Sequence, residues 1–384
     1  MRIVIIGNGV AGVSVAETIR KEDKESGITI LSDENYPFYS RPRLIEVLAG
    51  KSSAGQIVIH SGSWYEKNGI DLRLGSQVTG IDTARGKVID QSGGSVFYDT
   101  LVIAAGASCR VPPVPGIDGD RVFTLRSIAD AEKIRAFAAT RKNAVIIGGG
   151  LSGIESAFAL VSLGLTVTVV EVFDRLLPHQ LDHEGSALLR GLLEARGLSF
   201  VTGARVKSIS RNADGVAVAT GNAAPLTSDF VVVAAGIKPH TSIVKDTAIA
   251  HNRAIIVDEG MRTSCPGIYA CGDGAECGGT IYGLWQPARE QGIVCGNRIL
   301  GHETAFAGSV PSARLKVAGI EFASVGSIVG DEGVVQVRDK DDAAGTYRNL
   351  FIRDKKLVGA ILIGNVKETT ALQSKIRTGE EYNE

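Results

Sequence analysis

Two clusters of glycines in this sequence have the spacing that lets a backbone approach a phosphate group. These glycines are Gly7, Gly9 and Gly12 in the first cluster and Gly148, Gly150 and Gly153 in the second. Each cluster follows an apolar run typical of a buried strand and precedes an apolar pattern typical of a helix. In that setting, backbone N–H groups and the positive end of the helix can contact a pyrophosphate. One copy alone is weak evidence, but two copies in the same setting predict two dinucleotide-binding units.

An acidic residue should follow each cluster by about 20 residues and accept hydrogen bonds from an adenosine ribose. In the second unit, Glu171 ends the next predicted strand. In the first unit Ser32 ends the strand, so we favour the nearby Glu34 as the acceptor, with Asp33 as the alternative. The other interpretation of these carboxylates is that they are solvated acids in turns. Arg175, shortly after Glu171, could accommodate the 2′-phosphate of NADPH if it reaches the same pocket.

The elements that must position these residues form a repeated strand–turn–helix pattern. It opens at residues 2–6 and returns at residues 143–147, and each unit closes with an apolar strand followed by Ala-Ala-Gly. From about residue 303 the pattern changes to short alternating runs, typical of a small α+β domain. The expected fold class is therefore α/β, with two Rossmann-like dinucleotide-binding domains and a small C-terminal α+β domain.

Composition excludes several classes of protein. The 384 residues are enough for two or three domains, and 41 basic against 42 acidic residues argue against nucleic-acid binding through bulk charge. The five cysteines are odd in number and widely spread, which predicts no secretory disulfide framework. No apolar run reaches the length of a membrane helix, and the opening residues lack signal-peptide features. We therefore expect a cytoplasmic protein with no membrane partner.

Over essentially its whole length, the sequence resembles the FAD-dependent pyridine nucleotide oxidoreductases with a glutathione-reductase-like fold. Within them it is similar to the branch of NADH:rubredoxin oxidoreductases, ferredoxin reductases and nitrite-reductase flavin domains. The segments that carry this resemblance, besides the glycine clusters and the two Ala-Ala-Gly sequences, are Pro37-Phe38-Tyr39-Ser40-Arg41-Pro42-Arg43-Leu44 and Ile268-Tyr269-Ala270-Cys271-Gly272-Asp273. The resemblance implies an FAD-binding domain in two parts, an NAD(H)-binding domain and a small C-terminal domain. Their expected ranges are 1–108 with 239–302, 109–238, and 303–384.

The resemblance also implies roles for residues outside the glycine clusters. Asp273 would hydrogen-bond the ribityl chain of FAD, and Arg41 with Pro42 would lie beside the isoalloxazine ring. Glu155 would lie near the nicotinamide and the flavin N5 atom, paired with a basic residue for which Arg41 is the candidate. The other positions implied to bind a cofactor are Ala105, Gly106, Gly236, Gly272, Trp285, Gln291 and Lys316.

Four of these assignments have a purely structural alternative. Asp273 could cap the following helix, and Glu155 could simply interact favourably with the dipole of its own helix. Trp285 could be an ordinary core residue, and Lys316 could be a surface lysine.

The absence of one cysteine motif separates this sequence from the disulfide reductases of the same fold. Those enzymes carry a cysteine pair just after the first unit, and the peroxidase and oxidase branch carries a single cysteine there. This sequence has no cysteine before Cys109 and no C-x-x-C pair. Cys271 and Cys277 have no histidine or third cysteine nearby, so we expect no metal site.

The expected function follows from these observations. Electrons would pass from NADH through FAD to a small redox protein, rubredoxin or ferredoxin, without a thiol relay, and rubredoxin is the acceptor that we favour. One alternative is another NADH-dependent flavoprotein that reduces ferredoxin, nitrite or oxygen. A different alternative is a non-catalytic NADH-sensing flavoprotein on the same fold.

Overall fold

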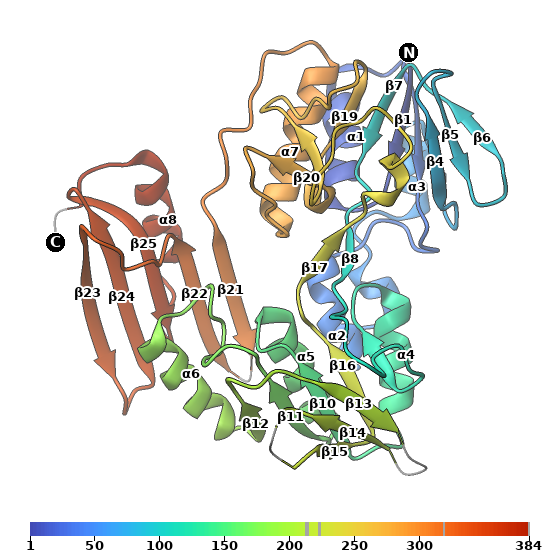
Figure 1. Cartoon of the computed structure of the whole chain (residues 1–384). Helices are drawn as coiled ribbons and strands as arrows, with labels where there is room; N and C mark the ends of the chain where they lie inside the picture. The colour runs from blue at the N-terminus through green and yellow to red at the C-terminus, as the bar shows by residue number, and fades with distance from the viewer. Residues whose placement is uncertain (212–214, 222–223, 318, 383–384) are drawn as a thin grey trace. The chain divides into compact units, whose positions relative to one another are not determined.

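The computed structural model describes residues 1–384 except 212–214, 222–223, 318 and 383–384. The chain divides into two compact units, each assembled from three stretches of sequence (Figure 1). The stretches of the first unit are Met1–Leu44, Ser52–Ser108 and Ile237–Ser309. Those of the second unit are Ile45–Lys51, Cys109–Gly236 and Val310–Glu384. The four-part division expected from the sequence stays a prediction.

The first unit is built on a five-stranded parallel sheet. Its strands, in spatial order, are β19 (Ile268–Ala270), β7 (Thr100–Ile103), β1 (Arg2–Ile6), β2 (Gly27–Leu31) and β3 (Ile70–Arg73). The residues of β7 and all but the first of β1 are buried, as expected for a parallel sheet covered on both faces. A smaller antiparallel sheet in this unit contains β4 (Val78–Asp82), β5 (Lys87–Asp90) and β6 (Ser95–Phe97).

Two helices of the first unit cross at short range. Helix α1 (Val10–Glu22) follows the first glycine cluster, and α7 (Trp285–Ile299) packs against it. A Cβ atom on Gly292 would lie 2.4 Å from the carbonyl oxygen of Ala11, so only glycine allows this approach. The close crossing fixes α7 beside the start of α1.

The second unit also has a five-stranded parallel sheet, and four of its strands follow the order of the first unit, whereas the fifth comes from an earlier part of the chain. Its parallel strands are β12 (Leu198–Val201), β11 (Thr166–Val170), β10 (Asn143–Ile147), β16 (Phe230–Val233) and β9 (Val122–Thr124). The helices of this part are α4 (Ile128–Ala138), α5 (Leu151–Ser162) and α6 (His183–Glu194). A three-stranded antiparallel sheet contains β13 (Ser208–Arg211), β14 (Val216–Ala219) and β15 (Leu226–Ser228). The predicted pair of Rossmann-like folds is confirmed.

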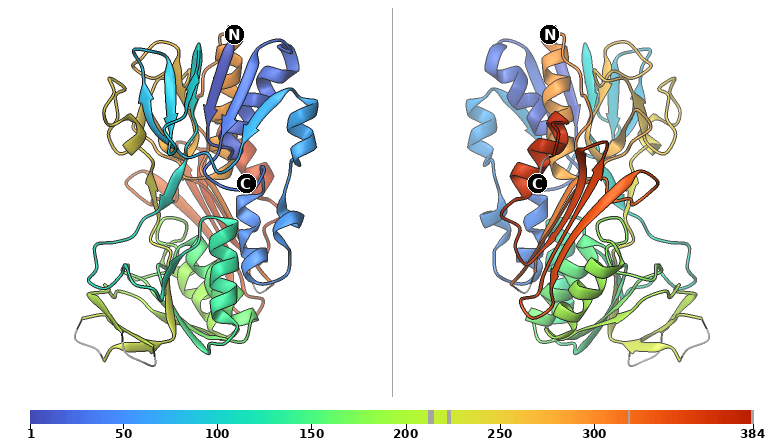
Figure 2. Two further views of the ribbon diagram at one scale, coloured as in Figure 1. Left: turned by 90° about the vertical axis from the view of Figure 1, so that its right-hand side faces the viewer. Right: turned by 90° about the vertical axis from the view of Figure 1, so that its left-hand side faces the viewer.

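The C-terminal residues of the second unit form an antiparallel sheet with one helix. The strands, in spatial order, are β21 (Ser312–Val317), β22 (Ile320–Gly326), β25 (Lys356–Ile363), β24 (Thr346–Arg353) and β23 (Val334–Asp341). Helix α8 (Thr369–Thr378) packs on this sheet (Figure 2). Its Leu372 side chain joins a core that includes Leu350 and Leu362. This is the predicted small α+β domain.

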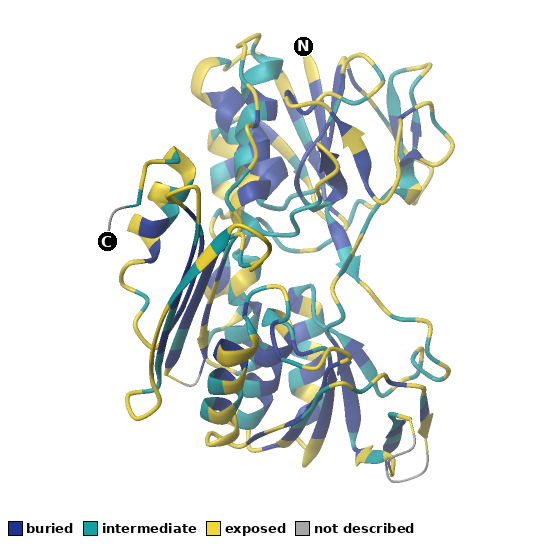
Figure 3. Ribbon diagram, turned by 60° about the vertical axis from the view of Figure 1, so that its left-hand side comes forward, coloured by how far each residue is buried: buried dark blue, intermediate teal, exposed yellow. Residues whose placement is uncertain are grey.

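The remaining short elements include two helices and two two-stranded sheets. The helices are α2 (Leu44–Leu48) and α3 (Gly62–Lys67). The sheets pair β8 (Ala107–Cys109) with β17 (Ile237–Pro239) and β18 (Ile255–Val257) with β20 (Ala275–Cys277). Buried residues lie along the central strands and on the helix faces that cover them (Figure 3). Among the described residues, no helix combines the length and the apolar character that crossing a membrane requires.

Candidate active site

The first glycine cluster is shaped by backbone contacts that exclude a side chain. Gly7 has φ of +106°, and a Cβ atom there would lie 2.2 Å from the carbonyl oxygen of Ala104. A Cβ on Gly12 would lie 2.1 Å from the carbonyl oxygen of Gly7. At Gly9, in contrast, no atom lies within 4 Å of an added Cβ. The outer glycines therefore close the turn, and the middle one faces open space.

The second cluster has the same geometry. Gly148 has φ of +117°, and a Cβ atom there would lie 2.3 Å from the carbonyl oxygen of Ala234. A Cβ on Gly153 would lie 1.9 Å from the carbonyl oxygen of Gly148, and Gly150 again faces open space. In both units the cluster thus packs against the Ala-Ala-Gly sequence, whose predicted site residues are Ala105 and Gly106 in the first unit and Gly236 in the second.

Both helices that follow these clusters begin without a capping side chain. The N-caps of α1 and α5 are Gly9 and Gly150, and neither helix has an acidic residue in its first turn. By comparison, Ser127 caps α4 and Asp182 caps α6 through side-chain hydrogen bonds. Uncapped N–H groups, a helix dipole and open space together fit the pyrophosphate of a dinucleotide.

One buried polar atom in the first cluster also fits a bound cofactor. The Asn8 side chain accepts a hydrogen bond from the Tyr65 hydroxyl at 2.8 Å through Oδ1. Its Nδ2 atom is buried and has no partner within the described part of the chain. Buried donors are nearly always paired, so an acceptor beyond the protein atoms suits this position. Sequence reasoning missed Asn8, although it stands inside the cluster.

Arg41 is held by a carboxylate of its own unit. Its guanidinium donates to Glu34 Oε1 at 2.8 Å, while the Tyr39 hydroxyl donates to Glu34 Oε2 at 2.7 Å. The Arg41 and Glu34 side chains are 26% and 22% exposed. Burial lowers the pKa of Arg41, but the neighbouring Tyr39 and Glu34 raise it above its ordinary value, and Asp273 adds to their effect. The guanidinium therefore stays charged.

This ion pair gives Glu34 a role that the sequence did not suggest. Both of its carboxylate oxygens accept bonds from the protein, and its neighbour Asp33 is exposed. A carboxylate has about four lone-pair sites, so Glu34 can still accept from a ribose hydroxyl. The choice between the two acids as the ribose acceptor stays a prediction.

Asp273 stands in a tight turn that α7 supports. The turn is the 3₁₀ helix Gly272–Gly274, and the Gly272 N–H donates to Gln291 Oε1 at 2.8 Å. Gln291 is only 1% exposed, so it positions this turn from inside the core. The N-cap of α7 is Leu284, so Asp273 does not cap that helix.

Trp285 joins the beginning of α7 to the segment that carries Arg41. Its ring stacks on Phe38 with 5.7 Å between ring centroids and 13° between ring planes. Phe38 is buried, while Pro42 is exposed. The structure therefore brings together Trp285 and the segment 37–44, which the resemblance places on the flavin side of the site.

Glu155 is a half-buried acid just after the second glycine cluster. It has no hydrogen-bond or ion-pair partner in the part of the chain that the structure describes. Burial raises the pKa of Glu155 to about 7. The expected partner, Arg41, belongs to the other unit and is bonded to Glu34, so the Arg41–Glu155 pair stays a prediction.

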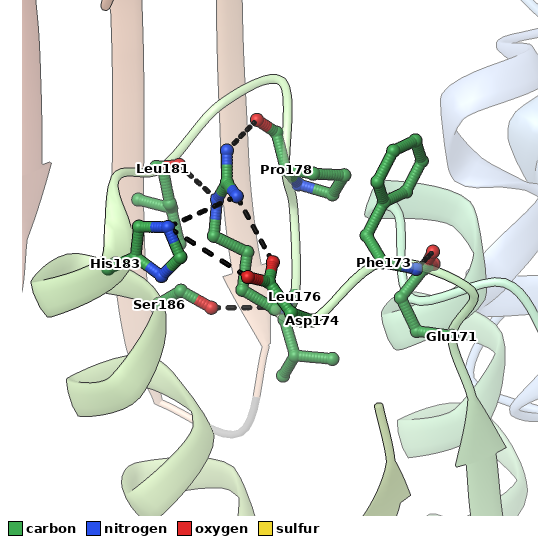
Figure 4. Close-up of polar contacts among 9 residues, drawn as sticks. Glu171, Phe173, Asp174, Leu176, Pro178, Leu181, His183 and Ser186 are labelled. Atoms are coloured by element: carbon green, nitrogen blue, oxygen red, sulfur yellow. Dashed lines mark hydrogen bonds and ion pairs between the residues drawn. The ribbon is translucent and has the colours of Figure 1, made fainter. Parts of the chain in front are cut away.

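Glu171 is buried at the end of β11, where it ties the second glycine cluster to the strand. It is 5% exposed, and its Oε2 atom accepts from the backbone N–H of Gly149 at 2.5 Å. Its Oε1 atom accepts from the backbone N–H of Phe173 at 2.9 Å, and Figure 4 shows Glu171 and Phe173 side by side. Phe173 is 47% exposed beside it. These two bonds fix the carboxylate beside the second glycine cluster, and its role as an adenosine ribose acceptor stays a prediction.

Arg175 forms hydrogen bonds within the loop that follows β11. Its guanidinium donates to the carbonyl oxygens of Pro178 at 3.2 Å and Leu181 at 3.4 Å, and to Asp174 at 3.2 Å. In Figure 4, Pro178 and Leu181 lie apart from Glu171. The possibility that Arg175 shares the pocket of Glu171 therefore finds no support in this geometry.

Lys316 lies on β21 in the second unit. Its side chain is 78% exposed and its ammonium group lies 2.7 Å from Glu321 Oε1 on the adjacent strand. These are the surroundings of a surface lysine. A position beside the flavin stays a prediction without support from its contacts.

The cysteines do not form a redox pair of the kind found in disulfide reductases. All five are free, and Cys271 and Cys295 are fully buried. Burial and the adjacent Cys271 raise the pKa of the Cys295 thiol well above its ordinary value, which disfavours a reactive thiolate. Among the described residues, no cluster of acids, histidines and cysteines could hold a metal ion.

Comparison with known proteins identifies the family. The model of the pyridine nucleotide-disulphide oxidoreductases matches residues 1–292. The chain belongs to this family. A second model, the rubredoxin NAD⁺ reductase C-terminal domain, matches residues 311–380. The family resemblance and the fold class that the sequence predicted are both confirmed.

The relatives of this chain include proteins of different overall length. It is 37% identical over 373 residues, 97% of the chain, to the assimilatory nitrate reductase electron transfer subunit of Bacillus subtilis. The chain spans only 48% of that relative. It is also 33% identical over 382 residues to the NADH-rubredoxin oxidoreductase of Clostridium acetobutylicum, spanning 96% of it. The crystal structure of the Clostridium acetobutylicum NADH:rubredoxin oxidoreductase aligns with this chain at a TM-score of 0.83 and 31% identity. The alignment covers 100% of this chain and 96% of the crystallised chain.

Family membership implies FAD and NADH as the cofactors of this chain. The residues present fit both groups, because each unit offers an uncapped helix N-terminus behind a glycine turn with open space in front. The unpartnered Asn8 Nδ2 atom in the first unit adds a donor for one of them.

Removing the Asp273 carboxylate is expected to cost the protein its flavin. Leaving a buried hydroxyl without its charged acceptor costs about 1–3 kcal/mol or more, so Asp273→Ala should purify with a low ratio of flavin to protein absorbance. Asp71→Ala, which removes a half-exposed carboxylate of the same unit, serves as the control. Full flavin occupancy in Asp273→Ala would count against the assigned ribityl contact.

Proposed function

We propose that this protein transfers electrons from NADH through FAD to a small redox protein, with rubredoxin as the favoured acceptor. The observation that carries the proposal is the presence of two glycine turns with the same geometry, one in each unit, in a chain whose five cysteines are all free. The C-terminal domain model and the NADH-rubredoxin oxidoreductase relative support rubredoxin as an acceptor.

The first unit would hold the flavin. The α1 N-terminus would accept the pyrophosphate, and Asp273 would bond the ribityl hydroxyls from the turn that Gln291 supports. Arg41, fixed by Glu34, would place a permanent positive charge beside the ring and stabilise negative charge there. When bound, FAD would supply two kinds of chemistry: it can accept a hydride from NADH, and it can pass the two electrons on one at a time with the proton released to solvent.

The second unit would hold NADH. The α5 N-terminus would contact its pyrophosphate, and Glu171 would accept from its adenosine ribose hydroxyls. Glu155 would stand near the nicotinamide, where a carboxyl with a pKa of about 7 can hold or release a proton at neutral pH.

A protein without a thiol relay should not need its cysteines. We expect that replacing all five cysteines by serine or alanine leaves NADH-to-acceptor turnover within a few-fold, provided that the variant folds and keeps its flavin. Cys271, Cys277 and Cys295 are buried, so alanine is the better replacement at these three positions. Loss of turnover with flavin still bound would reveal a cysteine relay and contradict the proposal.

Anaerobic mixing of the flavin-loaded protein with NADH separates the enzyme from a sensor. An oxidoreductase should lose its flavin absorbance within the time of a turnover. Slow bleaching with a stable charge-transfer band would favour the NADH-sensing alternative and contradict the proposed activity.

A further inference from the structure

The C-terminal sheet is joined to the nucleotide-binding part of the same unit at the beginning of α6. Asp182, the N-cap of α6, uses its two carboxylate oxygens for different contacts. Oδ1 accepts from the backbone N–H of Gly185 at 2.8 Å. Oδ2 accepts from the Tyr347 hydroxyl at 2.6 Å and from Asn349 Nδ2 at 2.7 Å. One carboxylate therefore starts the helix and holds two side chains of β24.

The two side chains of β24 are buried, and Asp182 is partly buried. Tyr347 is 1% exposed and Asn349 is 0% exposed. Burial and the adjacent Asp182 raise the pKa of Tyr347, so its hydroxyl remains a donor. A Cβ on Gly185 would lie 3.1 Å from the Tyr347 ring, so glycine lets this ring approach the helix. Removing one partner from such a buried set of hydrogen bonds leaves an unsatisfied group behind.

The loop between β11 and α6 connects this contact to the second glycine cluster. The Leu176 N–H donates to the hydroxyl of Ser186, in the first turn of α6, at 2.9 Å. The Leu177 N–H donates to the carbonyl oxygen of Gly149 at 3.0 Å. Leu177 is fully buried with φ of +49°, a conformation that non-glycine residues adopt rarely. The loop is therefore bonded to α6 at one point and to the glycine cluster at the next residue.

Gly149 completes the connection. It stands inside the glycine cluster, and its own N–H donates to Glu171 at 2.5 Å. Hydrogen bonds thus link β24, the beginning of α6, the loop and the proposed nucleotide site, all within the second unit. A shift at Asp182 would be transmitted to the positions of Gly149 and Glu171.

We propose that Tyr347 and Asn349 are positioning residues for NADH. By holding Asp182, the C-terminal domain keeps the 171–182 loop and the second glycine cluster in the conformation that binds the nucleotide. The inference rests on the proposed role of the second unit in NADH binding. It gives the C-terminal domain a function in nucleotide affinity, separate from any contact with the electron acceptor.

Two substitutions and one matched control test the proposal. Tyr347→Phe removes one hydrogen-bond donor and keeps the ring. Asp182→Asn keeps a side chain that caps helices well, but its amide nitrogen cannot replace Oδ2 as the acceptor for Tyr347 and Asn349. Tyr382→Phe is the control, because its hydroxyl accepts from Arg348 at 3.2 Å within the same C-terminal domain.

The readouts are NAD⁺ binding by calorimetry to the flavin-loaded protein and steady-state kinetics with ferricyanide, an acceptor that needs no partner protein. Both test variants should raise the Kd for NAD⁺ and the KM for NADH by about three- to tenfold, which corresponds to loss of roughly one buried hydrogen bond. The kcat and the flavin content should stay within about twofold, and Tyr382→Phe should match the unmodified protein.

Three results would overturn the inference. Unchanged NAD⁺ binding in folded Tyr347→Phe and Asp182→Asn variants would contradict this inference and leave the proposed function intact. Parallel loss of flavin, kcat and NAD⁺ affinity would show that these residues act only on the stability of the fold. An unmodified protein that takes up flavin but does not bind NAD⁺ would contradict the proposed function, and this inference with it.

Discussion

The unmodified protein is expected to use NADH at least roughly tenfold better than NADPH in kcat/KM, and Glu171→Gln should reduce that ratio. The 2′-phosphate of NADPH carries about −1.5 to −2 charge and would lie against the Glu171 carboxylate. At about 4 Å and an effective dielectric constant near 20, each pair of like unit charges costs roughly 4 kcal/mol. Salt and local movement reduce this repulsion, but even about 2 kcal/mol corresponds to a preference of about thirtyfold.

The surroundings of Glu171 strengthen this expectation. Its carboxylate is fixed by two backbone N–H groups, so it cannot easily turn away from a phosphate. Arg175, the cation that could neutralise the phosphate, donates instead to the carbonyl groups of Pro178 and Leu181. Glu194→Gln, at an exposed ion pair of the same unit, should leave the nucleotide ratio unchanged. Equal use of both nucleotides by the unmodified protein would contradict the assignment of Glu171.

Replacing Glu155 by glutamine is expected to stabilise the protein at pH 8 and not at pH 5. The pKa of Glu155 is raised from 4.5 to about 7 by burial, so the folded protein keeps a proton that the unfolded chain has released in this range. The unfolding free energy therefore falls as the pH rises from about 4.5 to about 7. At 1.36 kcal/mol for each unit of pKa, the loss reaches up to about 3 kcal/mol above pH 7.

Denaturant unfolding of the flavin-free protein at pH 5 and pH 8 measures this effect. The neutral amide of Glu155→Gln carries no titrating proton, so the variant should gain stability over the unmodified protein only at the higher pH. Glu66→Gln, at an exposed position, should follow the unmodified protein at both values. Identical pH dependence in Glu155→Gln and the unmodified protein would show that Glu155 is well solvated when folded.

The parts of the site that the sequence predicted are those determined by local backbone geometry. Gly7 and Gly148 need positive φ and contact with backbone, which no other residue tolerates, so their spacing alone indicates the turn. The strands β1 and β10 are continuous apolar runs, which identify them as buried parallel strands. Glu171 ends the strand that follows the second glycine cluster, at about the number of residues that a strand–turn–helix–strand unit requires.

The features that the sequence did not predict depend on how separate segments meet. The Glu34–Arg41 ion pair requires the intervening segment to fold back, and nothing in the residue pattern between them specifies that path. Tyr347 and Asp182 are 165 positions apart, so no periodicity relates them. The N-cap role of Asp182 could have been predicted from the local sequence, because a short acidic side chain precedes an amphipathic run. The contacts of its Oδ2 atom with Tyr347 and Asn349 could not have been predicted in this way.

The most direct test of the central proposal is rapid mixing of the NADH-reduced protein, under anaerobic conditions, with one acceptor at a time. Rubredoxin, ferredoxin and nitrite are each mixed at matched concentration, and oxygen is tested separately. We predict that the flavin absorbance returns fastest with rubredoxin, by at least about tenfold over the other acceptors, and that the cysteine-free variant behaves in the same way. Faster return with ferredoxin, nitrite or oxygen, or no return with rubredoxin, would contradict the proposed electron transfer.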